Sequence, residues 1–200
     1  MKKQSKYQLN KIGRNLDFFF NLATKKEINE GKQWYKKANL FCNDVSTQYN
    51  CSPFVVAQVV SALSPRNKWA QNLKDAKKVF QAVKEGKQPE EIKVCTFNKN
   101  KFKAFQIAKG LQQISPDSKK TYNFCKNIAY LCGESLTVDI WHLRACLKQF
   151  KSISSAQIGK LAYEQIKSLT IKKANKLGLT GFEYQAILWV TVQNNINKLK

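Results

Sequence analysis

The chain has 200 residues and a formal net charge of +22, which comes from 35 basic and 13 acidic side chains. Its 43% hydrophobic and 12% aromatic content argues against intrinsic disorder. The charge predicts a polyanionic partner, and nucleic acid fits better than an anionic membrane surface. The length most simply indicates one domain, with two lobes possible.

The first 30 residues are expected to form an appended basic arm or helix. Their one dense apolar run, Phe18–Phe20, is too short for the core of an export signal or for a membrane span. We therefore predict a cytoplasmic protein that does not insert into membranes.

Residues 31–200 are predicted to form a single helical domain. Apolar side chains recur at helical spacing within 34–49, 69–83 and 182–196. Helical patterns also fit residues 53–63, 99–114, 117–132, 139–150 and 154–169. Proline and glycine residues separate these segments, and no segment alternates as a strand would. The sequence therefore predicts a compact all-α fold of about eight to ten helices.

The cysteines do not indicate a metal site. None of the six forms a C-x-x-C pair, and the chain has one histidine, His142. Zinc and iron–sulfur centres need denser ligand sets than this. We expect reduced thiols, no metal and no cofactor.

Arginine is rare, because lysine outnumbers it 32 to 3. Lysine thus supplies the general positive charge, and arginine is expected where a flat, forked, stackable cation is needed. Arg66 lies in "SALSPRNKW" and Arg144 in "TVDIWHLRA". Chance placement of these two residues is the alternative.

Ser115 and Pro116 are predicted to begin a helix, with the serine as N-cap and the proline in the first turn. Such a helix start attracts phosphate, and Lys119 and Lys120 follow closely. A capped helix with surface lysines and no ligand is the alternative.

Asp139 is the only acid between Glu134 and Glu164, and it precedes a predicted helix that carries His142 and Arg144. It can act as the N-cap of this helix or as a catalytic carboxylate, and one carboxylate can do both. His142 is expected to face DNA or to be structural, since a single histidine without a visible orienting acid is weakly specified as a base.

The stretch around Asp139 resembles the helix-hairpin-helix superfamily of DNA glycosylases, whose members share the endonuclease III-like fold. In that family a Val-Asp pair precedes a helix that begins with a histidine and has an arginine five residues after the aspartate. Val138, Asp139 and Arg144 stand at this spacing, while His142 lies one place later than the histidine of the family. The resemblance implies a two-lobed helical fold.

Upstream segments extend the resemblance. Leu63–Arg66 and Asn72 match a Leu-Ser-x-Gln turn and the asparagine after it, which puts Arg66 at the wedge position. Lys103 and Ala104 match a Lys-Ala pair near a helix start. Lys120 lies nineteen residues before Asp139, where the family has a lysine about eighteen residues before its aspartate. The stretch "GFEYQAILWV" is similar to small phage-encoded members, so coverage is roughly 53–150 and 178–192.

Two features depart from the family. The glycine-rich hairpin is absent, and "SPDSKK" stands in its place, so phosphate contacts would rest on the helix start and its lysines. The iron–sulfur cysteines of endonuclease III are also absent, so no cluster is expected.

The resemblance implies a monomeric DNA glycosylase that flips a damaged or modified base out of double-stranded DNA. Asp139 would stabilise the positive charge that develops on the sugar. In the family, a lysine at the position of Lys120 can form a Schiff base, but its offset favours base release without strand cleavage. The residues expected to bind DNA are Ser64, Arg66, Asn72, Lys103, Ser118, Lys119, His142 and Arg144. The residues expected to line the base pocket are Trp69, Trp141, Gln185 and Trp189, although a core position is the stronger expectation for each tryptophan taken alone.

Two other functions stay open. The first is a phage enzyme of the same fold that remodels a hypermodified pyrimidine in DNA. The second is a non-catalytic DNA-binding module with the same basic surface. Base release from duplex DNA separates glycosylase from binding module, and a modified nucleotide as product marks the modification enzyme.

Overall fold

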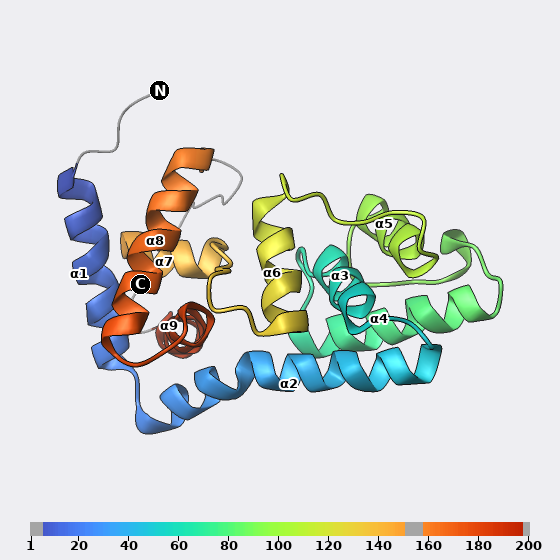
Figure 1. Ribbon diagram of the computed structural model, residues 1–200, viewed down its shortest axis with the longest axis horizontal. Helices are drawn as coiled ribbons and strands as arrows, with labels where there is room; N and C mark the ends of the chain where they lie inside the picture. The colour runs from blue at the N-terminus through green and yellow to red at the C-terminus, as the bar shows by residue number, and fades with distance from the viewer. Residues whose placement is uncertain (1–5, 151–157, 198–200) are drawn as a thin grey trace. The chain divides into compact units, whose positions relative to one another are not determined.

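A computed structural model describes residues 6–150 and 158–197. Within these ranges the chain forms α-helices and one short 3-10 helix, and no strand, which confirms the all-α expectation (Figure 1). By internal contacts the chain divides into two compact units: unit 1 comprises Met1–Lys36 and Cys132–Lys200, and unit 2 comprises Lys37–Leu131. The helices are α1 (Lys6–Leu22), α2 (Lys25–Tyr49), α3 (Pro53–Leu63), α4 (Trp69–Lys84), η1 (Pro89–Glu91), α5 (Asn98–Ala108), α6 (Lys119–Tyr130), α7 (Ile140–Leu147), α8 (Lys160–Lys176) and α9 (Gly181–Asn195).

Helix α1 is an integral part of unit 1. Its Ile12, Leu16 and Phe19 recur at helical spacing and belong to the buried core shared with α7, α8 and α9. The expectation of an appended arm or helix over residues 1–30 is therefore wrong for α1, because this apolar stripe has to be buried. Residues 1–5 of that range lie outside the described residues.

Helix α9 carries most of the remaining core of unit 1. Thr180 and Glu183 form a capping box, in which the Thr180 backbone N–H donates to Glu183 Oε2 at 3.0 Å. Nearly every side chain from Phe182 to Val192 is buried. Gly31 of α2 lets the two helices meet, because a Cβ atom there would lie 2.5 Å from the Cα atom of Ile187.

Helix α3 is the centre of unit 2. Ser52 caps it by accepting a hydrogen bond from the Val55 backbone N–H at 3.2 Å, and Pro53 occupies its first turn. Every residue from Val56 to Leu63 is buried, and α4, α5 and α6 pack around the helix. A helix that is apolar on all sides is expected to be enclosed in this way.

Two predicted helices have clearly different limits in the structure. The segment predicted over 99–114 ends at Ala108, because Gly110 has φ of 75° and closes a Schellman motif in which the Leu111 N–H donates to the Gln106 carbonyl. The segment predicted over 154–169 is α8, which begins at Lys160 and continues to Lys176. Residues 154–157 of that prediction lie outside the described residues.

The described helices include none that is long and apolar enough to cross a membrane. No disulfide joins the six cysteines, and Cys42, Cys125 and Cys146 are buried. Burial raises the pKa of the Cys42 and Cys125 thiols to about 12, which makes both poor nucleophiles at neutral pH. No group of three or more potential metal-ligating side chains occurs within residues 6–150 and 158–197.

Candidate functional site

Asp139 stands at the start of α7 in unit 1. Its Oδ1 accepts a hydrogen bond from the His142 backbone N–H at 2.8 Å, so the carboxylate is an N-cap. The side chain is only partly buried. The capping bond fixes the carboxylate while the residue keeps a route to solvent, which a catalytic role would also require.

The segment before Asp139 is held in place by one tyrosine. The Tyr163 hydroxyl of α8 donates to the Leu136 carbonyl at 2.8 Å and accepts from the Val138 N–H at 3.2 Å. Leu136 and Val138 are buried in the core of unit 1. These two hydrogen bonds, which we call the Tyr163 bracket, set the direction in which the chain enters α7 and therefore the position of Asp139.

His142 does not face solvent, so the prediction that it contacts DNA is wrong. It is fully buried, and its Nε2 lies 3.0 Å from Oγ1 of Thr170 on α8. The Thr170 hydroxyl already donates to the Ile166 carbonyl, so it accepts from His142 and the ring carries its proton on Nε2. Nδ1 has no hydrogen-bond partner among the residues that the structure describes. Burial lowers the pKa of His142 to about 4, so the ring is neutral at pH 7.

Trp141 and Arg144 stack on one another along α7. The guanidinium carbon of Arg144 lies 4.2 Å from the centroid of the Trp141 ring. Trp141 also packs against the core of unit 1 and is partly buried. Arg144 is itself partly buried beside this ring, and the DNA contact expected of it stays a prediction.

Gln185 and Trp189 of α9 are packed rather than open. Gln185 is 1% exposed, and its Oε1 accepts from the Tyr35 hydroxyl at 3.1 Å. Trp189 packs against Trp34, with ring centroids 4.7 Å apart. The prediction that Gln185 lines an open base pocket is wrong for this conformation, because its amide is enclosed within unit 1.

The turn that carries Arg66 lies in unit 2, between α3 and α4. The Asn67 N–H donates to the Ser64 carbonyl at 3.2 Å, Pro65 occupies the second position, and Arg66 has φ of 57°. A proline followed by a residue with positive φ is typical of a type II turn, where glycine usually takes the third position. Backbone preference would favour glycine here, and Arg66 is exposed. The arginine side chain itself is therefore a candidate for a functional role.

A buried carboxylate anchors this turn. Asp75 of α4 is 0% exposed and accepts from Asn67 Nδ2 at 3.0 Å, from Gln71 Nε2 at 2.8 Å and from the Cys95 backbone N–H at 2.8 Å. These bonds join the turn to the segment before α5. The Thr96 hydroxyl adds a bond to the Pro65 carbonyl at 3.0 Å.

Arg66 and Phe97 form an exposed pair above this anchor. The guanidinium carbon of Arg66 lies 5.4 Å from the centroid of the Phe97 ring, and the ring is 46% exposed. Sequence reasoning missed Phe97 and Asp75. The apolar residue directly before the α5 pattern and the lone acid within α4 were the available signals.

Asn72 is structural, so the prediction of a DNA contact is wrong for it. The residue is 1% exposed, and its amide donates to the Val60 carbonyl at 3.1 Å. Ser64 bonds back to the Ser61 carbonyl and Lys103 is partly buried, so their DNA contacts stay predictions. Trp69 packs edge-on against Phe124, with centroids 6.4 Å apart.

Helix α6 begins three residues later than the proline pattern predicted. Ser115 starts a turn, in which the Ser118 N–H donates to its carbonyl at 2.9 Å and the Asp117 N–H to its hydroxyl at 3.2 Å. Ser118 is the N-cap of α6 but makes no side-chain capping bond. Lys119 and Lys120 follow in the first turn, as expected of a phosphate-binding site at the N-terminus of a helix.

The predicted site residues thus fall into two groups. Unit 1 holds Asp139, Trp141, His142, Arg144, Gln185 and Trp189. Unit 2 holds Ser64, Arg66, Trp69, Asn72, Lys103, Ser118, Lys119 and Lys120. In each unit, part of the set is placed where a ligand can reach it and part is enclosed in the core.

Comparison with known proteins adds a family but no activity. No curated protein and no solved structure gives a significant match to the chain. A protein-family model described as "Family of unknown function (DUF7178)" matches residues 1–196. Because this match spans nearly the whole chain, the protein belongs to the DUF7178 family of unknown function.

Proposed function

We propose that this protein is a DNA glycosylase that releases a damaged or modified base from double-stranded DNA. The observation that carries the proposal is the position of Asp139, a partly buried carboxylate fixed at 2.8 Å by a backbone N–H. Breaking an N-glycosidic bond builds positive charge on the sugar, and a fixed carboxylate stabilises that charge without reorganisation.

The support around Asp139 suits this role. The Tyr163 bracket and the buried His142–Thr170 bond hold both ends of the short segment that carries the carboxylate. Neutral His142 leaves no cation on the ring that would compete for Asp139. The carboxylate would therefore act as a preorganised anion, and a water near it would be the nucleophile.

Arg66 supports the flipping step that the reaction needs. A base can reach a reactive group only after it leaves the stack, and a planar side chain can occupy the vacated space. Arg66 stands exposed at the tip of a turn that Asp75 anchors, and Phe97 supports its guanidinium. A planar cation can both stack on bases and contact phosphates.

The proposal is tested by offering the protein a panel of duplexes that each contain one modified or damaged base. Mass spectrometry of the released material identifies the product. A free base together with an abasic strand supports the glycosylase. A modified nucleotide retained in the strand would point to the base-modification enzyme instead.

A non-catalytic DNA-binding module is the second candidate, and one observation favours it. The same bond that fixes Asp139 is an ordinary helix cap, which many proteins use without catalysis. Tight duplex binding without any released base across the panel would favour this candidate.

A further inference from the structure

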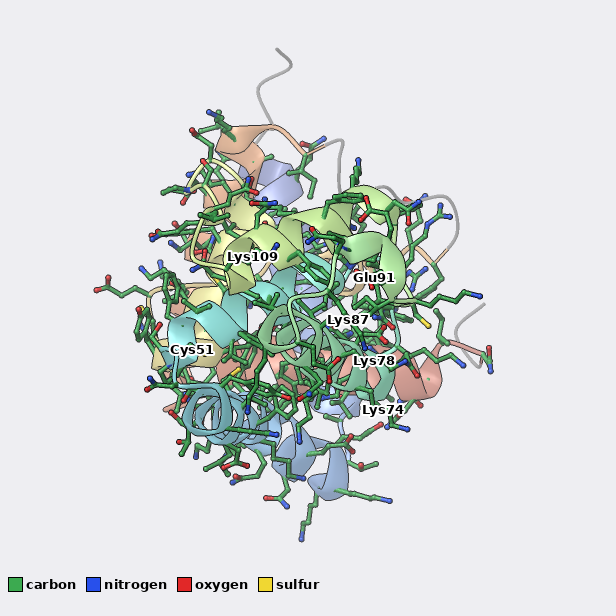
Figure 2. The ribbon with its side chains drawn as sticks, turned by 90° about the vertical axis from the view of Figure 1, so that its right-hand side faces the viewer. Cys51, Lys74, Lys78, Lys87, Glu91 and Lys109 are labelled. Atoms are coloured by element: carbon green, nitrogen blue, oxygen red, sulfur yellow. The ribbon has the colours of Figure 1, made fainter. Side chains whose placement is uncertain are left out.

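The C-terminal half of α4 borders a lysine-lined hollow in unit 2, apart from the residues discussed above. The hollow has a volume of about 430 Å³. Its lining combines α4 with the end of α2 and the segment around η1, and Figure 2 shows Lys74, Lys78 and Lys87 on this side of the molecule. The full lining is Tyr49, Lys74, Lys77, Lys78, Gln81, Ala82, Glu85, Lys87 and Ile92.

Charge in the hollow is strongly unbalanced. Four lysines against one glutamate leave a formal charge of +3 on its lining. Glu85 is already engaged, since its carboxylate pairs with Lys87 at 2.7 Å and accepts from Gln81 Nε2 at 2.5 Å. Nearby Glu91 is tied to the Gln88 backbone N–H at 2.6 Å.

Three of the four lysines of α4, Lys74, Lys77 and Lys78, have no acidic partner within the described part of the chain. Lys74, Lys77 and Lys78 lie at i, i+3 and i+4 and are exposed, so they share one helix face. Lys77 contacts the Phe41 ring at 5.6 Å through its ammonium group. Because like charges at this spacing destabilise a helix by a few tenths of a kcal/mol, an anionic partner would relieve repulsion.

The surroundings favour a nucleic acid over a membrane. Proteins that bind membrane surfaces usually insert apolar side chains beside their basic residues. None of the exposed large hydrophobic side chains in the described ranges lies on α4 or η1. A concave face with a net positive charge fits a phosphate backbone, which is bound without insertion.

We propose that Lys74, Lys77 and Lys78 form a nucleic-acid backbone contact separate from the Arg66 turn. This proposal rests on double-stranded DNA as the partner in the proposed function, but not on catalysis. Lys78 lies nine residues after the first residue of α4, an axial distance of about 14 Å. This corresponds to the rise of about four base pairs of a duplex.

The test compares two triple variants in duplex binding across a range of salt concentrations. In one, Lys74, Lys77 and Lys78 become glutamine, which keeps the helix propensity. In the matched control, Lys25, Lys172 and Lys176, which are exposed lysines of unit 1, become glutamine. Fluorescence anisotropy with a labelled duplex gives log Kd against log salt between about 50 and 200 mM. Circular dichroism verifies that both variants fold.

The proposal predicts that the α4 variant reduces the salt slope by about 2 to 3, since each lost phosphate contact removes about 0.9. Affinity should fall at least about tenfold at the lower salt. The control should change the slope by less than about one. Equal slopes for the two variants would overturn the proposal, and so would α4-dependent binding to phosphatidylglycerol vesicles without a change in duplex binding.

The two proposals fail in different ways. Base release is therefore measured on the wild type, and the salt dependence of duplex binding on the wild type and the two variants. If the variant binds DNA like the wild type while bases are still released, only the α4 contact is wrong. If the wild type releases no base but the salt slope changes as expected, only the glycosylase is wrong.

Discussion

Acid should destabilise this protein through His142. Burial lowers the pKa of the ring from 6.5 to about 4, so the unfolded chain binds a proton in this range that the folded chain does not. A folded-state pKa below the unfolded value means that the stability is fully present above pH 6.5 and is lost as the pH falls toward 4. At about 1.4 kcal/mol per pKa unit, linkage gives a loss of about 3 kcal/mol between pH 7 and pH 4. About 2 kcal/mol of this loss falls between pH 7 and pH 5.

Urea unfolding between pH 5 and pH 7 measures this effect. His142 is the only histidine, and unperturbed carboxylates and lysines do not titrate in this window. His142→Gln should therefore unfold with a free energy that is nearly independent of pH there. Thr170→Val is the matched control, because it removes the hydroxyl partner of the ring but leaves the histidine to titrate. If the free energy of unfolding changes with pH in the same way for the wild type and His142→Gln, the reasoning is refuted and the ring is accessible to solvent.

Three further predictions follow from particular contacts. Arg66→Ala should slow base release more than it weakens non-specific binding, and Arg66→Lys should restore little because a point charge cannot stack; full activity of the lysine variant would point to a plain phosphate contact. Borohydride treatment should trap no covalent complex through Lys120, and a trapped complex that disappears in Lys120→Ala would show lyase chemistry. Gly31→Ala should lower the free energy of unfolding by about 1–3 kcal/mol, because its Cβ would meet the Ile187 backbone. Gly133→Ala, where a Cβ meets no atom within 4 Å, should be close to neutral in the same urea titration.

The sequence predicted best those helices whose ends carry a local signal. Ser52 and Pro53 mark the start of α3, and the apolar run after them has to be enclosed. Thr180 and Glu183, three residues apart, have the spacing of a capping box and likewise mark the start of α9. In both cases the cap and the hydrophobic run point to the same structure, so no tertiary information was needed.

Predictions failed where a local signal had two meanings. Ser115 and Pro116 suit a helix start and a turn equally well, and the turn is formed. Gly110 ends α5 by a backbone conformation that a tolerated helical glycine would not adopt. The apolar stripe of α1, formed by Ile12, Leu16 and Phe19, is visible in the sequence. The basic residues around it nevertheless led to the prediction of an appended arm.

The candidate site was predicted in its residues more than in their surroundings. Position alone indicated that Asp139 begins a helix, and the capping bond confirms it. The burial of His142 depends on Thr170, which lies 28 residues away on another helix, so no local pattern could reveal it. Asp75 was missed for the same reason, since its partners come from two separate segments.

The most direct test of the account is single-turnover base release by the wild type and Asp139→Asn on one responsive duplex. Asparagine keeps an oxygen that can accept the His142 N–H, so the cap and the fold should survive. If the charge of Asp139 stabilises the transition state, the rate should fall by two to three orders of magnitude or more, roughly 3–4 kcal/mol, while duplex binding persists or tightens. Circular dichroism verifies the fold. Equal rates in two folded proteins would contradict the account and make Asp139 a helix cap alone.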